Sequence, residues 1–506
     1  MFDAAVLSRP LPEGSFYALL AEHGDRIVRD EDFAECYSAR MGRPSIPPSL
    51  LAKVMLLQHR AGVSDEQAME AVAWDLRWKV ALGLPVDHQG WHPTSLTKFR
   101  ARLLLHKKEG LALENTLRLA EELGMLDGCV EQIIDSTPGA AATQDTVRLV
   151  RHGVKKLIDA VAAADQDAGG RLDAGLEFDY ERPGEKPDCP WREKAERERM
   201  LTQVAKDAER ALLAVEQADG VLDDEQVKAA HELLRELIGQ DFDIDQDGVP
   251  RLHRGTRSDR IVSTLDTEMR HGRKSSQQRF DGYKLSAAAT NGPEPLITAV
   301  HVSPAGESDG QQAKRLIDAL PPELRPDRVL GDTAYGNGPV RAELAERDVQ
   351  VLAPVPEGKV VADRLGKRDF QIDVHAGTVT CPAGQTVPIS TSKTGFRGAN
   401  FQSTVCGECP LKAVCCPGRS RRQINLREHE DLLLAARQAL ADPATAEHLR
   451  RGRPRIERLL GLLAHRYGAR KSRYIGSAKA RMQASWAAAL VNLNPIGHQL
   501  ALQSDA

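Results

Sequence analysis

The stretch VEQIIDSTPG, residues 130–139, ends an apolar run on a carboxylate, and DRVLGDTAYGNG, residues 327–338, repeats that pattern. Two isoleucines predict a buried strand that ends at Asp135, and a Val-Leu pair predicts a second strand that leads through a glycine to Asp332. A buried charge is costly unless it is paired or binds a metal. Open α/β sheets place their functional sites at the carboxyl ends of neighbouring strands. We therefore expect the two strands to lie side by side, with both carboxylates at one edge of the sheet.

Two adjacent carboxylates repel each other, so one of them would hold a proton unless a cation lies between them. Mg²⁺ suits this position because it prefers oxygen ligands and keeps several of its waters. Two such ions about 4 Å apart can activate an attacking oxygen and stabilise a leaving oxygen in phosphoryl transfer. A site of this kind usually needs a third carboxylate.

Glu457 is the best candidate for the third carboxylate. It lies in RGRPRIERLLGLLAHRYG, residues 451–468, and borders an apolar stripe with helical spacing. Arg453 lies one helical turn before it, on the same face. The alternative is an exposed Glu in a helical ladder of salt bridges, and the spacing alone does not separate the two interpretations. The stripe consists of Ile456, Leu459, Leu460 and Leu463.

Beyond these stretches, predicted strands alternate with predicted helices, which indicates an α/β protein with a mixed sheet. Two apolar runs on either side of Asn291-Gly292 predict a hairpin. Ser64 and Gln67 form a capping-box pair at the start of a helix, and Trp74 and Trp78, one turn apart, are expected in the core. The expected domains are a helical DNA-binding domain (1–125), the first core strand (126–142), a mainly helical insertion (143–277), the core sheet and helices (278–374), a cysteine-rich insert (375–420), C-terminal helices of the core (421–496) and a tail (497–506).

Composition places the 506-residue chain among globular proteins, at 41% hydrophobic and 28% charged residues. No apolar run approaches the roughly 20 residues of a membrane span. The first residues lack the basic start and apolar stretch of a signal peptide, so a cytoplasmic location is expected.

The net charge of −4 conceals a strongly basic segment at residues 447–481, where eleven Lys and Arg residues face only two Glu. Such a segment is either a solvated helical face or a phosphate-binding surface, and we favour the second because the run is long and nearly unmixed. Short helices that end on a basic one also suit a DNA-binding unit near the N-terminus. The candidate DNA contacts are Lys98, Arg100, Arg102, Arg453, Arg466, Lys471, Arg473 and Lys479.

Five of the eight cysteines cluster late in the chain, and in a cytosolic protein such a cluster favours metal binding over disulfides. A C-x2-C pair, a nearby third Cys and a distant fourth can close a tetrahedral zinc site of structural role. The alternative is a group of reduced thiols. The candidate zinc ligands are Cys381, Cys406, Cys409, Cys415 and Cys416.

The motifs IIDST, LGDTAYGN and RPRIERLLG, with FDGYKLSAAAT, STLDTEMRHGRKS and SRYIGSAKARMQ, together resemble bacterial insertion-sequence transposases of the DDE class. The resemblance spans nearly the whole chain and implies a ribonuclease H-like fold in which Asp135, Asp332 and Glu457 bind two Mg²⁺ or Mn²⁺ ions. Relatives carry a Tyr-x2-Arg-x3-Glu-x6-Lys signature; here Arg450 and Ala464 occupy its first and last positions.

The resemblance further implies cleavage at the ends of a mobile element and strand transfer into target DNA. The partners would be double-stranded terminal inverted repeats and target DNA, bound by a homodimer or a larger assembly that associates with the bacterial nucleoid. Two alternatives have a different function. One is a non-catalytic DNA-binding protein derived from a decayed transposase, and the other is a metal-dependent nuclease without strand transfer.

Overall fold

The structure is a computed structural model. It describes the chain except residues 1–10, 13, 38–44, 129, 141–142, 258, 274–277, 358–362, 393–394, 396 and 505–506. Among the described residues, no helix is long and apolar enough to cross a membrane.

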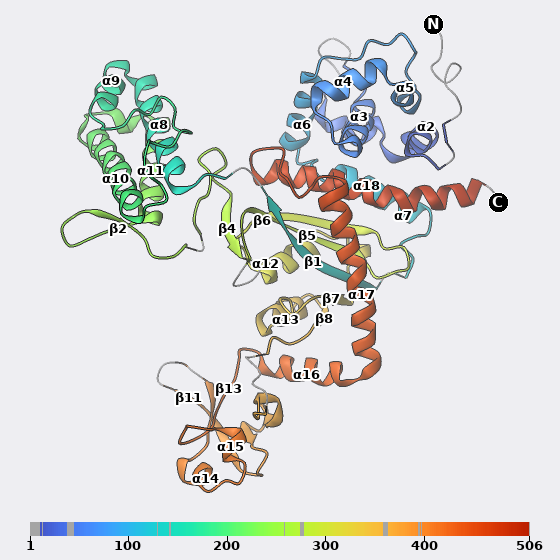
Figure 1. Cartoon of the computed structure of the whole chain (residues 1–506). Coiled ribbons are helices and arrows are strands. Elements are labelled where there is room, and N and C mark those ends of the chain that lie inside the picture. Colours follow the sequence, from blue (N-terminus) through green and yellow to red (C-terminus); the bar gives the residue numbers. More distant parts are fainter. Residues whose placement is uncertain are drawn as a thin grey trace.

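A six-stranded mixed sheet lies at the centre of the molecule, in the order β4-β5-β1-β7-β8, with β6 also paired to β5 (Figure 1). β5 runs antiparallel to β1 and β6, whereas β7 and β8 run parallel to β1. This confirms the predicted mixed α/β architecture and the hairpin at Asn291-Gly292, which joins β5 to β6. The strands are β1 (Glu131–Ala140), β4 (Arg270–Arg273), β5 (Arg279–Thr290), β6 (Ile297–Pro304), β7 (Arg328–Leu330) and β8 (Gln350–Leu352).

β1 is longer than predicted. It continues past Asp135 to Ala140 because β5 pairs with it from Gln132 onward, so the prediction that the strand ends at Asp135 is wrong. β7 pairs only with the first three residues of β1, which leaves the other edge of β1 unpaired beyond Ile133. Pro138, which has no backbone N–H, can lie in the strand because that edge is unpaired.

Helices cover both faces of the sheet. Ile133 and Leu330 pack with α17 (Pro443–Gly461) and α18 (Ser477–Ser504), whereas Ile134 and Val329 pack with α12 (Asp309–Asp318) and α13 (Gly338–Ala345). Successive residues of a strand point to opposite faces of the sheet. Ile133 and Ile134 on β1 follow this alternation, as do Val329 and Leu330 on β7. The expected tail, 497–506, is helical as far as Ser504, because α18 continues along the N-terminal helices.

The N-terminal helices form one hydrophobic core with α18, α17 and the neighbouring face of the sheet. α18 lies between these helices and the sheet (Figure 1). The predicted capping box is confirmed, since Ser64 accepts from Gln67 N and Gln67 accepts from Ser64 N. The elements are α2 (Phe16–Ile27), η1 (Asp30–Cys36), α3 (Pro48–Ala61), α4 (Asp65–Trp74), α5 (Leu76–Leu82), α6 (Thr94–Leu105) and α7 (Leu111–Glu122).

The two tryptophans of this region have different environments. Trp78 is buried as predicted, but Trp74 is 75% exposed, so its assignment to the core is wrong. The chain leaves one helix at Trp74 and enters the next at Leu76, with Asp75 capping the second helix. The residues therefore do not share one helical face.

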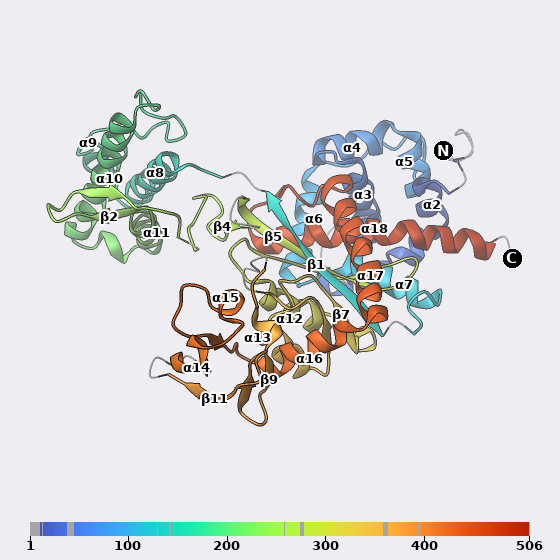
Figure 2. The same ribbon diagram turned by 60° about the horizontal axis from the view of Figure 1, so that its bottom comes forward.

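The helical insertion is a separate lobe with its own hydrophobic core (Figures 1 and 2). The chain enters and leaves it at adjacent points, because Gln144 N donates to Val262 O at 2.9 Å and Thr264 N donates to the Gln144 side chain at 2.8 Å. Its elements are α8 (Thr146–Ala164), α9 (Gln166–Ala174), α10 (Lys194–Gln217), η2 (Val221–Asp223), α11 (Glu225–Asp241), β2 (Phe242–Ile244) and β3 (Pro250–Leu252).

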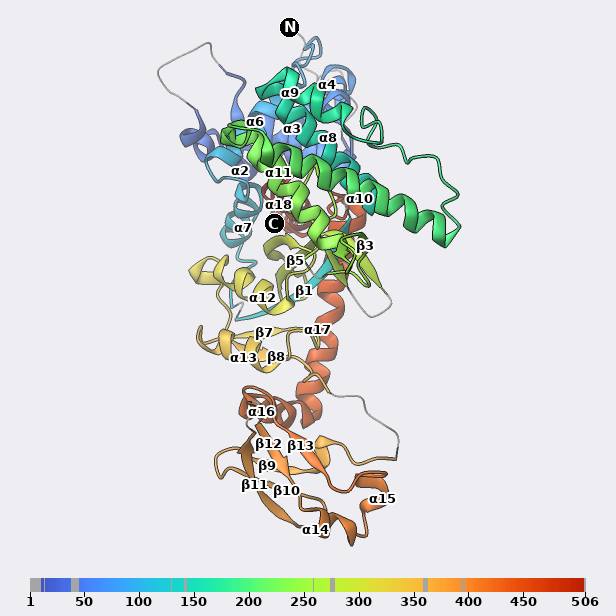
Figure 3. The ribbon, with the colours of Figure 1, turned by 90° about the vertical axis from the view of Figure 1, so that its left-hand side faces the viewer.

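The cysteine-rich module is a second lobe, at the opposite end of the core from the N-terminal helices (Figure 3). Its five-stranded antiparallel sheet spans Gln371 to Asn425, beyond both limits of the expected 375–420 insert. Its elements are β9 (Gln371–Asp373), β10 (Thr378–Thr380), β11 (Thr386–Thr391), β12 (Arg397–Asn400), α14 (Ser403–Gly407), α15 (Lys412–Cys415) and β13 (Gln423–Asn425). η3 (Pro322–Leu324), η4 (Lys367–Asp369), α16 (Glu430–Ala441) and η5 (Leu462–Arg466) complete the described elements.

Candidate active site

Asp135 lies in the middle of β1, opposite Ala287 of β5. It follows Ile133 by two residues, so its side chain projects to the sheet face that α17 covers. One of its oxygens, Oδ1, accepts a hydrogen bond from Ser136 N at 2.7 Å. The strand thus presents a carboxylate toward the helix that contains the predicted third acid.

Asp332 begins the turn that follows β7. Ile133 pairs with Leu330, so Asp332 stands two residues beyond the last pair, as Asp135 does on β1. Asp332 Oδ1 accepts from Ala334 N at 2.8 Å, which fixes the turn. A Cβ on Gly336 would lie 1.9 Å from Pro354 O, so this close turn requires glycine. The expectation that the two strands lie side by side is confirmed.

Glu457 projects from α17, whose stripe residues Ile456, Leu459 and Leu460 are buried against the sheet core. Two contacts anchor the helix: His448 to Glu131 at 2.6 Å, and Arg455 to Asn291. Its Glu457 side chain is 56% exposed and pairs with Arg453 at 3.3 Å. The helix is therefore fixed while Glu457 stays accessible to a ligand.

All three predicted carboxylates line one cavity of about 320 Å³. Arg453 lies in the same lining, one helical turn from Glu457. The three acids come from β1, from the turn after β7 and from α17, elements that are far apart in the sequence. The cavity therefore combines acidic ligands with a cation suited to an anionic substrate.

The cavity raises the pKa of Asp135 to about 6. Burial is the largest cause, and the charges of Asp332 and Glu457 raise the pKa further; the Ser136 N–H and Arg453 oppose the shift. The residues that line the cavity include four acids, Asp135, Asp309, Asp332 and Glu457, and three cations, Arg273, Lys284 and Arg453. The site therefore has excess negative charge in the absence of a cation.

Sequence reasoning missed three further charged residues of the cavity, Arg273, Lys284 and Asp309. Lys284 Nζ donates to Asp309 Oδ1 at 3.1 Å, and Ser136 Oγ donates to the same oxygen at 3.2 Å. Lys284 lies opposite Pro138 in the β1–β5 register, Arg273 is the last residue of β4, and Asp309 is the first residue of α12. No local signal marks these residues, because the pairing of distant strands and the packing of α12 bring them to the cavity.

The donor set suits a hard divalent cation, because several carboxylates line one cavity and the pKa of one of them is raised. In the described part of the chain, no group of three or more His, Cys, Asp or Glu side chains is arranged to hold a metal ion. Mg²⁺ does not require such a group, since it is commonly held by one or two carboxylates together with waters and substrate phosphates.

Comparison with known families gives two matches. Residues 5–102 match a family described as transposase domain (DUF772), and residues 380–496 match a family described as transposase DDE domain. The chain is therefore similar to transposases in both segments, and to those of the DDE class in the second. No curated protein and no solved structure matches the chain. The match to the DDE domain includes Glu457, whereas Asp135 and Asp332 lie outside it, so their assignment to an active site depends on the shared cavity.

The predicted DNA contacts of the N-terminal domain differ in exposure. Lys98 is exposed. Arg100 is buried and donates to Asp65 at 3.0 Å, with its guanidinium over the Tyr474 ring, so the expectation of a free phosphate contact does not fit it. Arg102 lies 4.5 Å over the Tyr37 ring. In this domain Lys98 is thus the candidate whose charge faces solvent.

The predicted contacts of the basic segment also differ in exposure. Arg466, Lys471 and Lys479 are exposed. Arg473 donates to Val63 O at 2.5 Å and so joins the C-terminal region to the N-terminal helices. Arg453 belongs to the cavity itself. We retain Arg453, Arg466, Lys471 and Lys479 as candidates for binding DNA.

The candidate zinc ligands lie together only in part. Cys381, Cys406 and Cys415 pack against the same small core as Phe370 and Phe401. The pKa of Cys415 is raised to about 11, mainly by burial, with its neighbouring thiols adding to the shift. In the described part of the chain, these thiols do not form a group of three or more side chains that could hold a metal ion. Zinc binding by Cys381, Cys406, Cys409, Cys415 and Cys416 stays a prediction.

Proposed function

We propose that the protein is the transposase of an insertion sequence, which cleaves DNA at the element's ends and joins them to target DNA. The observation that carries the proposal is the convergence of Asp135, Asp332 and Glu457 on one cavity beside Arg453. Its substrates would be double-stranded DNA with terminal inverted repeats and a target duplex. Two ends must be brought together, so the active form would be a homodimer or a larger assembly.

In this proposal, different side chains of the cavity have different roles in phosphodiester cleavage. Asp135, Asp332 and Glu457 would hold two divalent cations, Mg²⁺ or Mn²⁺, which when bound stabilise charge on the attacking and leaving oxygens. Arg453 offsets the repulsion between these acids and the scissile phosphate. Lys284, fixed by Asp309, and Arg273 add further positive charge to the cavity wall. Positioning and charge neutralisation are the main requirements of such reactions, and no covalent intermediate with the protein is needed.

The proposal is tested with the full-length protein, Mg²⁺ and DNA carrying the ends that flank its gene. Asp135→Asn, Asp332→Asn and Glu457→Gln should each lower the cleavage rate by at least about 100-fold, because each removes a carboxylate needed for charge stabilisation. Binding of the same DNA in EDTA should change less than about threefold, since no phosphate contact is removed.

Glu323→Gln, a change of an exposed acid in η3, is the matched control and should keep wild-type cleavage. Full cleavage by Glu457→Gln would move the third acid elsewhere. Cleavage without joining to a second duplex would identify a nuclease, and DNA binding without any cleavage would identify a decayed transposase.

A further inference from the structure

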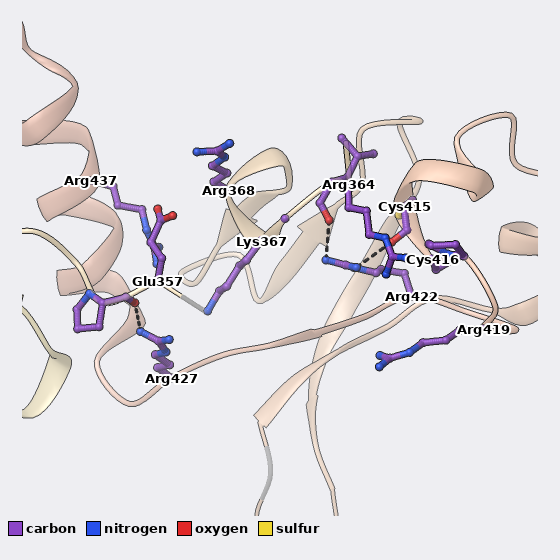
Figure 4. A pocket seen from close by; sticks show the side chains of 14 residues that line it. Glu357, Arg364, Lys367, Arg368, Cys415, Cys416, Arg419, Arg422, Arg427 and Arg437 are labelled. Atoms are coloured by element: carbon purple, nitrogen blue, oxygen red, sulfur yellow. Dashed lines mark hydrogen bonds between the residues drawn. The ribbon is translucent and has the colours of Figure 1, made fainter. Parts of the chain in front are cut away.

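A second cavity, of about 410 Å³, lies where the cysteine-rich module meets α16 (Figure 4). One acidic side chain, Glu357, lines it alongside seven cationic ones. Figure 4 shows Arg427, Arg437 and Glu357 on one side of the cavity and Arg364, Arg419 and Arg422 on the other. We call this cavity the basic cleft; its cations are Arg364, Lys367, Arg368, Arg419, Arg422, Arg427 and Arg437.

Internal ion pairs offset only part of this charge. Glu430 is buried behind the cleft, pairing with Arg437 at 3.3 Å and with Lys367. If Glu430 and Glu357 each neutralise one cation, five positive charges remain. The pKa of Lys367 is lowered by burial, and the charges of Arg437 and Arg427 lower it further, although Glu430 opposes the shift. The cleft therefore has an excess of positive charge that an anion would relieve.

Several guanidinium groups of the cleft have donors without acceptors. Arg364, Arg368 and Arg419 are exposed, and their side chains make no hydrogen bond or ion pair with the described residues. The buried Nε atoms of Arg422 and Arg437 also lack partners among those residues.

Arg422 is nevertheless held rigidly, because it donates to Cys415 O at 2.8 Å and to Leu365 O at 3.0 Å. Free donors on a fixed wall are suited to phosphate oxygens, which guanidinium groups bind with favourable geometry.

The position of the cleft favours a long polyanion. α16 leads directly into α17, and α17 carries exposed Arg450 and Arg451 as well as the Arg453–Glu457 pair. The fourteen residue steps from Pro443, the start of α17, to Glu457 rise about 21 Å along the helix. At 3.4 Å per nucleotide along a strand, that length corresponds to about six base pairs.

We propose that the basic cleft binds the sugar-phosphate backbone of duplex DNA about six or more base pairs from the cleaved phosphate. The inference rests on the proposed function, because it supposes that duplex DNA occupies the carboxylate cavity. It adds the cysteine-rich module to the DNA-binding surface. A duplex engaged at the carboxylate cavity would run along α17 and reach the cleft with its backbone.

The test measures binding of a 40-bp duplex to the full-length protein in EDTA, by fluorescence anisotropy from about 50 to 200 mM salt. Each lost phosphate contact should flatten the slope of log affinity against log salt by about 0.9. Arg364→Ala/Arg419→Ala should therefore flatten it by up to about two. The matched control is Arg192→Ala/Arg254→Ala, which removes two exposed arginines from the helical insertion and should leave the slope unchanged. Arg364→Lys/Arg419→Lys keeps both charges and should keep the wild-type slope, because the slope depends on the number of neutralised phosphates, while its affinity should fall with the loss of the guanidinium donors.

The outcomes separate this inference from the proposed function. Wild-type protein that fails to bind duplex DNA would overturn both. Wild-type binding with an unchanged slope in Arg364→Ala/Arg419→Ala would overturn the inference alone. If the double variant lost affinity for an RNA hairpin of similar length but not for the duplex, the cleft would be an RNA site and the inference would again be wrong.

Discussion

At the scale of single residues, His59 lies where two distant parts of the chain meet. It is buried in α3, and its ring stacks on Trp486 of α18 with centroids 6.2 Å apart. Burial lowers its pKa to about 3; Arg473 and Arg100 lower it further, and Asp65 opposes them. The imidazole is therefore neutral in the folded protein at neutral pH.

This burial predicts a pH-dependent stability. Below about pH 6.5, His59 is protonated in the unfolded chain but stays neutral in the folded chain. The free energy of unfolding therefore decreases as the pH falls. We expect His59 to account for about 2 kcal/mol of lost unfolding free energy between pH 7 and pH 5. Urea denaturation of His59→Phe should show a shallower pH dependence than wild type. The control, His375→Phe at an exposed position, should keep the pH dependence of wild type. A pH dependence of His59→Phe equal to that of wild type would contradict the prediction.

Sequence patterns predicted individual residues well where the deciding signal was local. Asp135 and Asp332 were predicted because each follows an apolar run. Arg100 was misjudged because its partner, Asp65, lies 35 residues earlier and no helical period connects them. Lys284 could not be predicted because only the register of β1 with β5 brings it to the cavity, and Asp309 could not because it reaches the cavity from α12.

At the scale of elements, α17 packs closely against the sheet at Gly452. A Cβ at this position would lie 2.6 Å from Leu330 Cδ2 and 3.4 Å from Asn291 Oδ1. Leu330 is the last residue of β7 and lies two positions before Asp332. The absence of a side chain at Gly452 thus sets the separation between the helix that carries Glu457 and the strand that leads to Asp332.

Gly452→Val should push α17 away from β7. Overpacking of this kind costs about 1–3 kcal/mol, and the displaced Glu457 should reduce cleavage more than DNA binding. Thermal denaturation and a cleavage assay measure the two effects. Gly461→Ala is the control, because nothing lies within 4 Å of its added Cβ and alanine is the better helix former, so its stability should rise slightly. Normal cleavage by Gly452→Val would show that the helix can shift without consequence.

The small sheet of the cysteine-rich module has few buried apolar residues to stabilise it: Phe370, Val379, Ala399, Phe401 and Ile424. Small units with so little core usually need a metal or a disulfide. We expect about one zinc per chain in protein purified without chelator, and we expect Cys406→Ser to release it. Elemental analysis measures the metal, and Cys36→Ser in the N-terminal core is the control. Metal-free protein of unchanged thermal stability would contradict the prediction.

Element types were more predictable than element ends. The helical stripe of α17 and the hairpin at Asn291-Gly292 follow from periodicity and turn chemistry, and both are confirmed. The length of β1 was underestimated because a strand ends where its partner ends, and the partner, β5, is about 150 residues away. A helix break at Asp75 separated two tryptophans that one continuous helix would have placed together.

At the scale of the whole molecule, two adjacent chain segments, at Gln144 and Thr264, connect the helical insertion to the core. Its core is self-contained, and buried Asp207 accepts hydrogen bonds from Glu177 N, Phe178 N and the Tyr180 hydroxyl. Residues 143–264 expressed alone should therefore unfold cooperatively, with a helical circular-dichroism spectrum. Asp207→Ala should lower the midpoint, since it leaves several buried donors unsatisfied. A broad, non-cooperative transition of the wild-type fragment would show that the insertion needs the core.

The adjacent entry and exit of the insertion also bear on how the catalytic sheet forms. β1 and β5 must find each other across about 150 residues of chain, a separation that slows folding. If the helical lobe folds first, it brings its own ends together and leaves about 30 residues of effective loop between the strands. That shortening lowers the entropy cost of closing the loop by about 1.4 kcal/mol. Asp135 would then reach its final environment only after a lobe that contributes nothing to its cavity has folded.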